Sequence, residues 1–257
     1  MRTDLFAEIC QHFVSDQALT AYLHAVTLYG VERWLFRREL TRNLASSILC
    51  NYVLAIGHRF LHRLAIVKQS AAFLQNETLP MVTASGQLSL IEVVPFRLTP
   101  SLQAYITPVG IDGVLASALV FGARKLAKPQ SDFMDFVTLF VRDELFIWYL
   151  NQQPQTSPSS SDESAFIQRT SVLSEIVEDP FEKIASLGIE QAAFLARVLQ
   201  NCELVAKRAQ TLACLKEEST RPTDREPHGM QTALDLISSA TNPQKLALMD
   251  AHWHPWF

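Results

Sequence analysis

Apolar residues recur every three to four positions over most of this chain, a spacing that predicts amphipathic helices. Residues 3–29 fit two short helices. Residues 32–57 fit one longer helix, which Gly57 is expected to end. Further helices are expected over residues 112–126, 132–149, 168–177, 189–215 and 230–239. The chain is therefore predicted to be mainly helical.

Residues 58–94 break this helical rhythm. Short β-branched runs at residues 64–67 and 88–94 are separated by residues that favour turns. Such a pattern is typical of short strands joined by loops. We therefore predict a small β patch beside the helices.

The segment that follows, residues 94–100, contains two prolines, Pro95 and Pro100. Each proline fixes its own φ and favours extended geometry in the residue before it. We expect an ordered but non-helical strut, with Arg97 on one side and its apolar neighbours on the other.

Two segments are polar and low in complexity, namely residues 152–164 and residues 216–228. Serine, glutamine and proline dominate the first, and the second contains two prolines. Segments of this composition bury too little apolar surface to fold, so we expect surface loops or linkers.

Composition excludes several classes of protein. The chain has 257 residues, 48% of them hydrophobic, which is enough for a full-sized core. Its net charge of −4 argues against direct binding to a nucleic-acid backbone. No run of about 18 apolar residues suggests a membrane span, and residues 1–20 lack the apolar core of a secretory signal. We expect a soluble, intracellular protein that does not bind membranes.

Two groups of side chains that suggest chemistry have simpler interpretations. Four arginines at helical spacing are expected to form a solvated helix face: Arg33, Arg37, Arg38 and Arg42. Four widely spaced cysteines with apolar neighbours are expected to be small buried hydrophobic residues: Cys10, Cys50, Cys202 and Cys214. The cysteines fit a reducing compartment.

Four motifs, in the right order, carry a family resemblance. The motif Pro95-Phe96-Arg97-Leu98-Thr99 closes the activation segment of the phosphatidylinositol 3-kinase-related protein kinases. The other three are Trp-Leu-Phe-Arg-Arg at residues 34–38, Val-Arg-Asp-Glu-Leu-Phe-Ile-Trp at residues 141–148, and the stretch from residue 240 to residue 257. That last stretch resembles the terminal FATC motif of these proteins. Within the family, the chain looks like the TRRAP-type pseudokinases.

The resemblance implies a protein-kinase-like C-terminal lobe of the phosphatidylinositol 3- and 4-kinase type, followed by a FATC helix and tail. We expect the pseudokinase lobe at residues 1–150, with remnants of the catalytic loop and activation segment at about residues 57–100. A polar linker (151–165), a helical continuation (166–215), a polar loop (216–228) and the FATC motif (229–257) are expected to follow. No glycine-rich phosphate loop or other lobe is visible, so we expect a fragment or an incomplete gene model.

The catalytic loop of active members reads Gly-Asp-Arg-His-x-x-Asn, and the matching stretch here is residues 57–63. His58 stands at the position of the catalytic Asp and Phe60 at that of the His. Arg63 stands where an Asn would bind magnesium, and an arginine repels that ion. Without these groups, phosphoryl transfer loses its electrostatic stabilisation. We therefore expect a pseudokinase.

The second magnesium ligand of active members, the Asp of Asp-Phe-Gly, is also missing. Between Arg63 and Pro95 the only acidic residues are Glu77 and Glu92. Glu92 lies too close to Pro95 for the usual spacing, which leaves Glu77 as a remote substitute. No cofactor is expected. No metal site is expected either, because the histidine pairs 58/62 and 252/254 lack further ligands at a recognisable spacing.

Two further structural roles are expected. Arg97 should form a structural ion pair with Asp143 or Glu144 beneath the activation segment, an inference that follows the resemblance. The final residues Trp253, His254, Pro255, Trp256 and Phe257 should fold back against the lobe, as the FATC resemblance implies. Large aromatic side chains at a chain end favour burial, because each covers roughly 150 to 250 Å².

The resemblance implies a non-catalytic scaffold. TRRAP-type proteins are subunits of nuclear histone acetyltransferase complexes of the SAGA type, which they bring to chromatin by binding transcription activators. Acetyltransferase-complex subunits and activators are therefore the expected partners, and the nucleus the expected location. The alternative is a fragment of an active or atypical phosphatidylinositol 3-kinase-related protein kinase.

Overall fold

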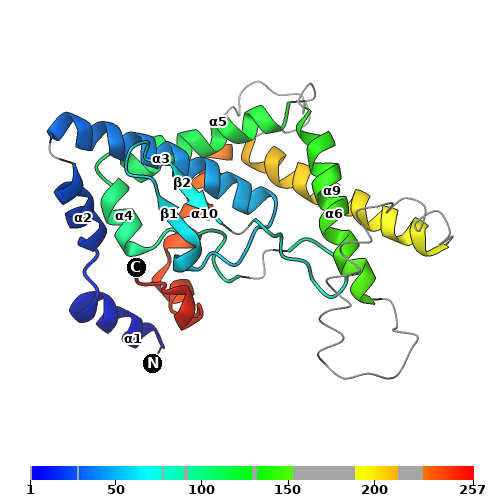
Figure 1. Ribbon diagram of the computed structural model, residues 1–257, viewed down its shortest axis with the longest axis horizontal. Helices are drawn as coiled ribbons and strands as arrows, with labels where there is room; N and C mark the ends of the chain where they lie inside the picture. The colour runs from blue at the N-terminus through cyan, green and yellow to red at the C-terminus, as the bar shows by residue number, and fades with distance from the viewer. Residues whose placement is uncertain are drawn as a thin grey trace.

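The structure is a helical body with one small two-stranded sheet, as predicted (Figure 1). The computed structural model describes residues 2–27, 29–76, 78–89, 92–128, 132–152, 189–213 and 228–257. Residues 153–164, 168–177 and 216–227, for which polar segments and a helix are predicted, lie outside this description.

The longest helix of the first half, α3 (Gly30–Val53), is the centre of the core. Its buried side chains include a row at four-residue spacing, as expected for one face of a helix: Phe36, Leu40, Leu44 and Ile48. The helix ends at Val53, before the predicted stop at Gly57. Ala55 already has a left-handed φ of 55°, which turns the chain out of the helix.

Helices from the second half of the chain pack around α3. Helix α5 (Ala116–Leu126) contacts α3, α9 (Ile189–Ala213) and α10 (His228–Thr241), while α6 (Phe133–Gln152) lies along α9. In Figure 1, α6 and α9 form one end of the molecule, away from both termini. These four helices confirm the helices predicted over 112–126, 132–149, 189–215 and 230–239.

Between α5 and the strut lie two helical elements that the sequence pattern did not separate. Helix α4 (Pro100–Ile106) was missed; it begins with Pro100 at its first turn, where the missing proline N–H costs nothing. A π-helical turn, η3 (Gly110–Leu115), precedes α5 and occupies the start of the predicted helix 112–126.

The sheet consists of β1 (Leu64–Ile66) and β2 (Phe73–Gln75), paired antiparallel with Leu64 opposite Gln75. Strand β1 confirms the run predicted at 64–67, and a short 3₁₀ turn, η2 (Leu61–Arg63), leads into it. The strand predicted at 88–94 is wrong for the residues of that range that the structure describes. Leu88 forms only an isolated bridge with Val82, and residues 92–96 bend.

A side chain from α9 takes the place of strand pairing in this region. Asn201 is fully buried, accepts a hydrogen bond from the Leu88 N–H (2.8 Å) and donates to the Gly86 carbonyl (2.8 Å). Arg208, on the same helix, donates to the Leu88 carbonyl (3.0 Å). Backbone groups that a strand partner would have satisfied are therefore satisfied by α9.

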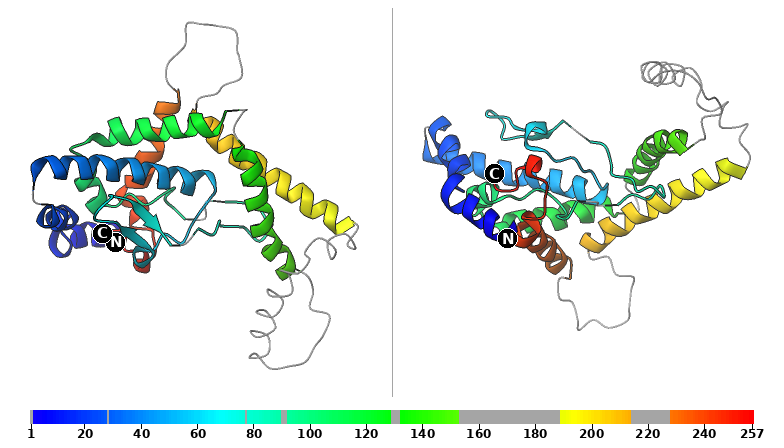
Figure 2. Two further views of the ribbon diagram at one scale, coloured as in Figure 1. Left: turned by 45° about the horizontal axis from the view of Figure 1, so that its top comes forward. Right: turned by 90° about the horizontal axis from the view of Figure 1, so that it is seen from below.

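The N-terminal helices are α1 (Arg2–Glu8), the π-helical η1 (Ile9–Phe13) and α2 (Ala18–Val26). Only part of their predicted apolar faces is buried: Leu23 is buried, whereas Phe13 is 75% exposed. The chain ends with α11 (Pro243–Leu246) and the 3₁₀ turn η4 (Ala251–Trp253). The two termini lie close together in both views of Figure 2.

Two of the simpler interpretations need correction. Cys202 is buried as predicted, but Cys50 is exposed and Cys10 only half-buried; Cys214 lies outside the described residues. Among the arginines of α3, Arg33 donates to the Thr27 carbonyl (2.8 Å), so that face is not wholly solvated.

No single helix in the described part of the chain is both long and apolar enough to cross a membrane. Helix α4 and residues 110–126 form a bent pair that is long and apolar enough when the two are taken together, a criterion that considers length and composition alone.

Candidate functional site

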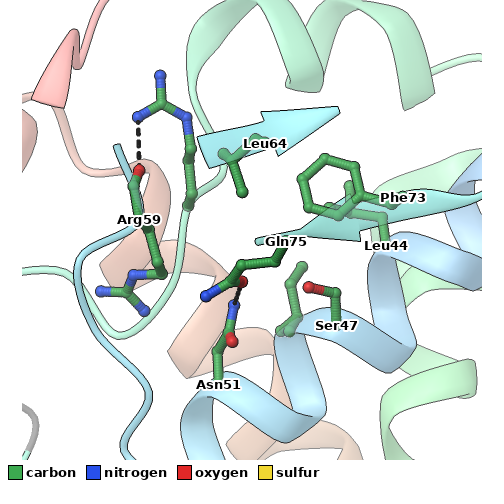
Figure 3. Close-up of a pocket in the computed structure, with 9 residues that line it drawn as sticks. Leu44, Ser47, Asn51, Arg59, Leu64, Phe73 and Gln75 are labelled. Atoms are coloured by element: carbon green, nitrogen blue, oxygen red, sulfur yellow. Dashed lines mark hydrogen bonds between the residues drawn. The ribbon is translucent and has the colours of Figure 1, made fainter. Parts of the chain in front are cut away.

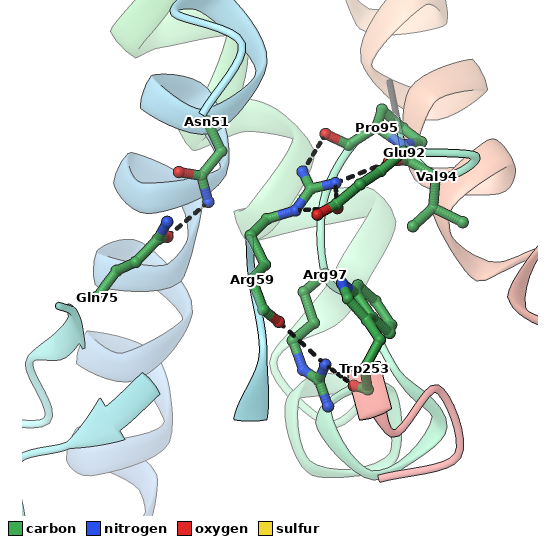
Figure 4. Close-up of polar contacts among 8 residues, drawn as sticks. All are labelled: Asn51, Arg59, Gln75, Glu92, Val94, Pro95, Arg97 and Trp253. Atoms are coloured by element: carbon green, nitrogen blue, oxygen red, sulfur yellow. Dashed lines mark hydrogen bonds and ion pairs between the residues drawn. The ribbon is translucent and has the colours of Figure 1, made fainter. Parts of the chain in front are cut away.

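Three segments far apart in sequence meet at two buried arginines, Arg59 and Arg97 (Figure 4). Arg59 comes from the catalytic-loop remnant and Arg97 from the strut, while the carbonyls of the C-terminal tail complete the cluster. We call Arg59, Glu92, Arg97 and Trp253 the two-arginine junction.

Arg59 ties the catalytic-loop remnant to the strut. Its side chain has no exposed surface, and its Nε donates to Glu92 Oε2 (2.8 Å), which its Nη2 also contacts. The remaining donors reach backbone oxygens: Nη1 donates to Pro95 (2.6 Å) and Nη2 to Val94 (2.9 Å). The Arg59 side chain thus fixes the strut, although Arg59 precedes Glu92 by 33 residues in the sequence.

Arg97 ties the strut to the C-terminal tail. Its Nη1 donates to the carbonyls of Arg59 (3.2 Å) and Trp253 (2.5 Å). Its Nη2 donates to the carbonyls of His254 (3.0 Å) and Phe257 (2.7 Å). The guanidinium also lies 4.3 Å from the centroid of the Trp253 ring, within range of a cation–π contact.

The junction concentrates positive charge in the protein interior. Burial, and then the nearby charge of Arg59, lower the pKa of Arg97 to about 10, although Glu92 acts in the opposite direction. Burial likewise lowers the pKa of Arg59, while its partner Glu92 opposes the shift. Among the described residues, Glu92 is the acidic side chain recorded at this junction, and it pairs with Arg59.

The ion pair predicted between Arg97 and Asp143 or Glu144 is not formed. Arg97 points toward the tail, and carbonyl oxygens surround its charged group. Asp143 lies on the exposed side of α6, where it accepts a hydrogen bond from Arg142 (2.8 Å). The prediction was wrong because it assumed a carboxylate where the backbone of the tail supplies the acceptors.

The tail itself is folded onto this part of the protein. Trp253 is 1% exposed and packs in a small cluster with Phe6, Val94 and Leu246. Asp250 begins the final turn by accepting from the His252 N–H (2.7 Å). Pro255 is buried, Trp256 and Phe257 are half-buried, and His254 adopts a left-handed φ of 51° that turns the chain.

The three substituted positions of the catalytic loop lie beside the junction. His58 is exposed with a left-handed φ of 54°, and Phe60 stacks on His62 with a centroid separation of 5.7 Å. The Arg63 guanidinium lies 5.8 Å from the Phe60 ring. Gly57 has no room for a side chain, because an added Cβ would overlap the Met81 sulfur.

The carboxylates of this region offer little to a metal ion. Between residues 57 and 100, Glu92 is the only acidic side chain in the described part, since Glu77 lies outside it. Glu92 is already paired with Arg59. No group of three metal-ligating side chains occurs among the residues that the structure describes.

A small cavity of about 10 Å³ separates the junction from α3 and the sheet (Figure 3). Asn51 and Gln75 face it, and the Asn51 amide donates to the Gln75 side-chain oxygen (2.9 Å). This volume is at the lower limit for one water molecule. The cavity is a packing defect beside the arginines and cannot hold a nucleotide.

Sequence reasoning identified Arg97 and the tail but missed Arg59 and Glu92 as site residues. Two signals for them were available. Arg59 matches the arginine of the family's catalytic-loop motif, and Glu92 is one of only two acidic residues between Arg63 and Pro95. An arginine at a motif position and a carboxylate that is scarce in its region are candidates for a buried pair.

Comparison with known proteins agrees with the order of these segments. The model of the phosphatidylinositol 3- and 4-kinase family matches residues 7–150, and that of the FATC domain matches residues 230–257. The chain is 26% identical over 256 residues to the SAGA complex/NuA4 acetyltransferase complex subunit Tra1 of Schizosaccharomyces pombe, which covers 99% of this chain.

Two further relatives show the same extent of similarity. The Saccharomyces cerevisiae SAGA complex/NuA4 acetyltransferase complex subunit TRA1 is 25% identical over 275 residues, covering 100% of this chain. The human transformation/transcription domain-associated protein is 24% identical over 257 residues, covering 98%. The chain spans about 6% of the length of each of these three relatives.

Proposed function

This chain belongs to the phosphatidylinositol 3- and 4-kinase family, and we propose that it is the non-catalytic C-terminal part of a TRRAP-like scaffold subunit. In this proposal the subunit works in nuclear histone acetyltransferase complexes of the SAGA type and binds transcription activators. The printed names of the Schizosaccharomyces pombe and Saccharomyces cerevisiae relatives as SAGA and NuA4 subunits support the choice of complex.

One observation carries the non-catalytic part of the proposal: Glu92, the acidic side chain described nearest the strut, is held by the buried Arg59. Phosphoryl transfer needs carboxylate or amide oxygens free to hold magnesium and a base near the attacking hydroxyl. Phe60 and Arg63 supply no such oxygen at the matching positions, and His58 stands in place of the catalytic carboxylate. The loop residues support a structural joint in place of a magnesium site.

The scaffold part of the proposal follows from what the joint connects. Arg97 fixes the tail to the strut through the backbone oxygens of three tail residues, so the end of the chain presents a fixed surface. We assign residues 1–150 to the pseudokinase lobe, 166–215 to its helical continuation and 229–257 to the FATC motif. A rigid lobe of this kind serves as a platform on which other subunits assemble.

Affinity purification of the full-length protein through an N-terminal tag, followed by mass spectrometry, tests this function. Acetyltransferase-complex subunits should co-purify with the wild type. Recovery should fall for Arg97→Lys, which weakens the hold on the tail, and should persist for Arg38→Lys on the surface of α3. Wild-type protein that recovers no acetyltransferase subunits would contradict the proposal.

A further inference from the structure

A second and larger cavity, of about 230 Å³, is also lined by Arg97. Helix α2, the sheet, the start of α4 and the last residue of the tail all contribute to its wall. Most of the lining is apolar, with Leu23, Phe73 and Leu102 as examples. An apolar cavity of about 150 Å³ can hold benzene, so this one has room for a ligand of about ten non-hydrogen atoms.

The polar groups in this wall are a buried hydroxyl and two cationic side chains. Ser101 is 1% exposed, and its hydroxyl has no hydrogen-bond partner in the structure. Buried hydroxyl groups almost always have a partner, so an unpartnered one that lines a cavity is available to a ligand or to a water molecule. Arg97 lines the cavity as well, and so does Lys68, which is exposed.

One cation in the wall of this cavity, Lys68, is recorded in no ion pair among the residues that the structure describes. Arg59 and Arg97 place two guanidinium groups in the interior, and the one acidic side chain recorded to pair with them is Glu92. The Nη atoms of Arg97 meet four backbone oxygens, and that of Phe257, the last residue of this 257-residue chain, belongs to an α-carboxylate that balances the charge of Arg97. Lys68 lies over the Tyr22 ring, 5.2 Å from its centroid, and adds a third cation. A negative group placed beside Lys68 would therefore be stabilised.

From the apolar lining, the unpartnered Ser101 hydroxyl and the cation Lys68, we propose that this cavity binds a small amphipathic anion. The ligand has an apolar body of about eight carbon atoms, set by the cavity volume, and a carboxylate or phosphate monoester head. The apolar body occupies the space between α2 and the sheet. The head accepts a hydrogen bond from Ser101 and lies near Lys68.

The proposal also gives the ligand an effect on the tail. Phe257 lines the cavity, and its carbonyl is held by Arg97. A ligand there contacts the strut, the sheet and the tail together, so it should stabilise their packing. Binding of this kind raises the melting temperature by mass action.

Amphiphiles with an eight-carbon chain and different head groups test the proposal. Their binding to the purified 257-residue chain is measured by calorimetry and thermal shift. The probes are sodium octanoate, octyl phosphate, 1-octanol and octylamine. At least one anion should bind saturably and at least about tenfold more tightly than 1-octanol, as expected for a charge-assisted hydrogen bond. Octylamine should not bind. The comparison of octanoate with octyl phosphate identifies which head group the site prefers.

Three variants separate the site from a general affinity for amphiphiles. Ser101→Ala and Lys68→Gln should each weaken anion binding about threefold to tenfold, and Leu61→Trp, at the cavity wall, should abolish it. Lys125→Gln is the matched control, because Lys125 also lies over an aromatic ring, that of Phe121, at 5.4 Å. Equal binding of octanoate, octyl phosphate and 1-octanol, unchanged anion binding by Ser101→Ala and Lys68→Gln, or no saturable binding of either anion would overturn the proposal.

Discussion

Arg97 contacts both the ring and the carbonyl oxygen of Trp253, although 156 residues separate them in the chain. The guanidinium lies 4.3 Å from the ring centroid while its Nη1 donates to the Trp253 oxygen over 2.5 Å. Only a planar fork of donors can make both contacts at once. The tail is therefore held by the chemistry of one arginine.

Replacing Arg97 by lysine should destabilise the protein by about 3 kcal/mol, because a lysine cannot reach four carbonyls and each charged hydrogen bond is worth about 1.5–3 kcal/mol. Arg38→Lys is the matched control, since Arg38 also lies over a tryptophan, Trp34, but at the surface. Its cost should stay below about 1 kcal/mol. Urea denaturation of both variants measures the difference, and equal costs would contradict the role of Arg97.

Glu92→Gln should cost about 3–5 kcal/mol, because it leaves the buried Arg59 without its counter-charge. Glu39→Gln is the control, since Glu39 pairs with Arg38 and Arg42 on an exposed face. In the double variant Arg59→Gln/Glu92→Gln, the total should be smaller than the sum of the single costs. Additive costs would show that the two side chains are not energetically coupled.

Trp253→Ala should cost about 3–5 kcal/mol, as expected for a fully buried aromatic side chain. Phe257→Ala should cost less, because Phe257 is only half-buried, and should lower protein abundance in cells. Leu248→Ala, at a position that is 54% exposed, should change stability by no more than about 0.5 kcal/mol. Thermal unfolding and limited proteolysis check these costs; a Trp253→Ala protein as stable as the wild type would mean that the tail is not packed.

Asn201→Ala should destabilise the protein by about 2 kcal/mol or more, because it leaves the Leu88 N–H and the Gly86 carbonyl buried without partners. The neighbouring Gln200 is exposed, so Gln200→Ala should have almost no effect. Hydrogen exchange at Leu88 gives a local readout. Unchanged protection of that amide in Asn201→Ala would contradict the contact.

Stability should fall as pH drops below about 6.5, in part through His24. Burial and the charges of Arg33 and Arg37 lower the pKa of His24, and its Nε2 lies 3.1 Å from a nitrogen of Arg37. The unfolded chain therefore binds a proton at higher pH than the folded one, so acid favours unfolding. The effect should be small, because His24 is partly exposed. His24→Gln should flatten the stability profile between about pH 5 and 7; an unchanged slope would exclude this contribution.

The sequence pattern predicted the helices well wherever a helix has one apolar face against the core. Helices α6 and α9 show this, because their bounds lie close to those expected from periodicity. The pattern failed where long-range contacts determine the local backbone structure. Residues 88–94 are rich in β-branched residues, yet Asn201 of α9 takes the hydrogen bonds that a strand partner would need.

The site was predictable in its parts but not in its pairing. The proline-flanked strut and the aromatic tail were visible in the sequence, whereas the acceptors of Arg97 are backbone carbonyls, which every residue carries. No residue type marks such partners in a sequence. Arg59 and Glu92 lie 33 positions apart, and only the fold of the intervening sheet brings them together.

The central claim is that the catalytic-loop remnant of this chain is a structural joint and not a site for magnesium and nucleotide. Calorimetric titration of the purified full-length protein with ATP and magnesium tests it most directly, with an active phosphatidylinositol 3-kinase-related kinase as the assay control. The account predicts no saturable heat at ATP concentrations up to about 1 mM, where even weak binding would be detected. Saturable, magnesium-dependent binding in the micromolar range would contradict it.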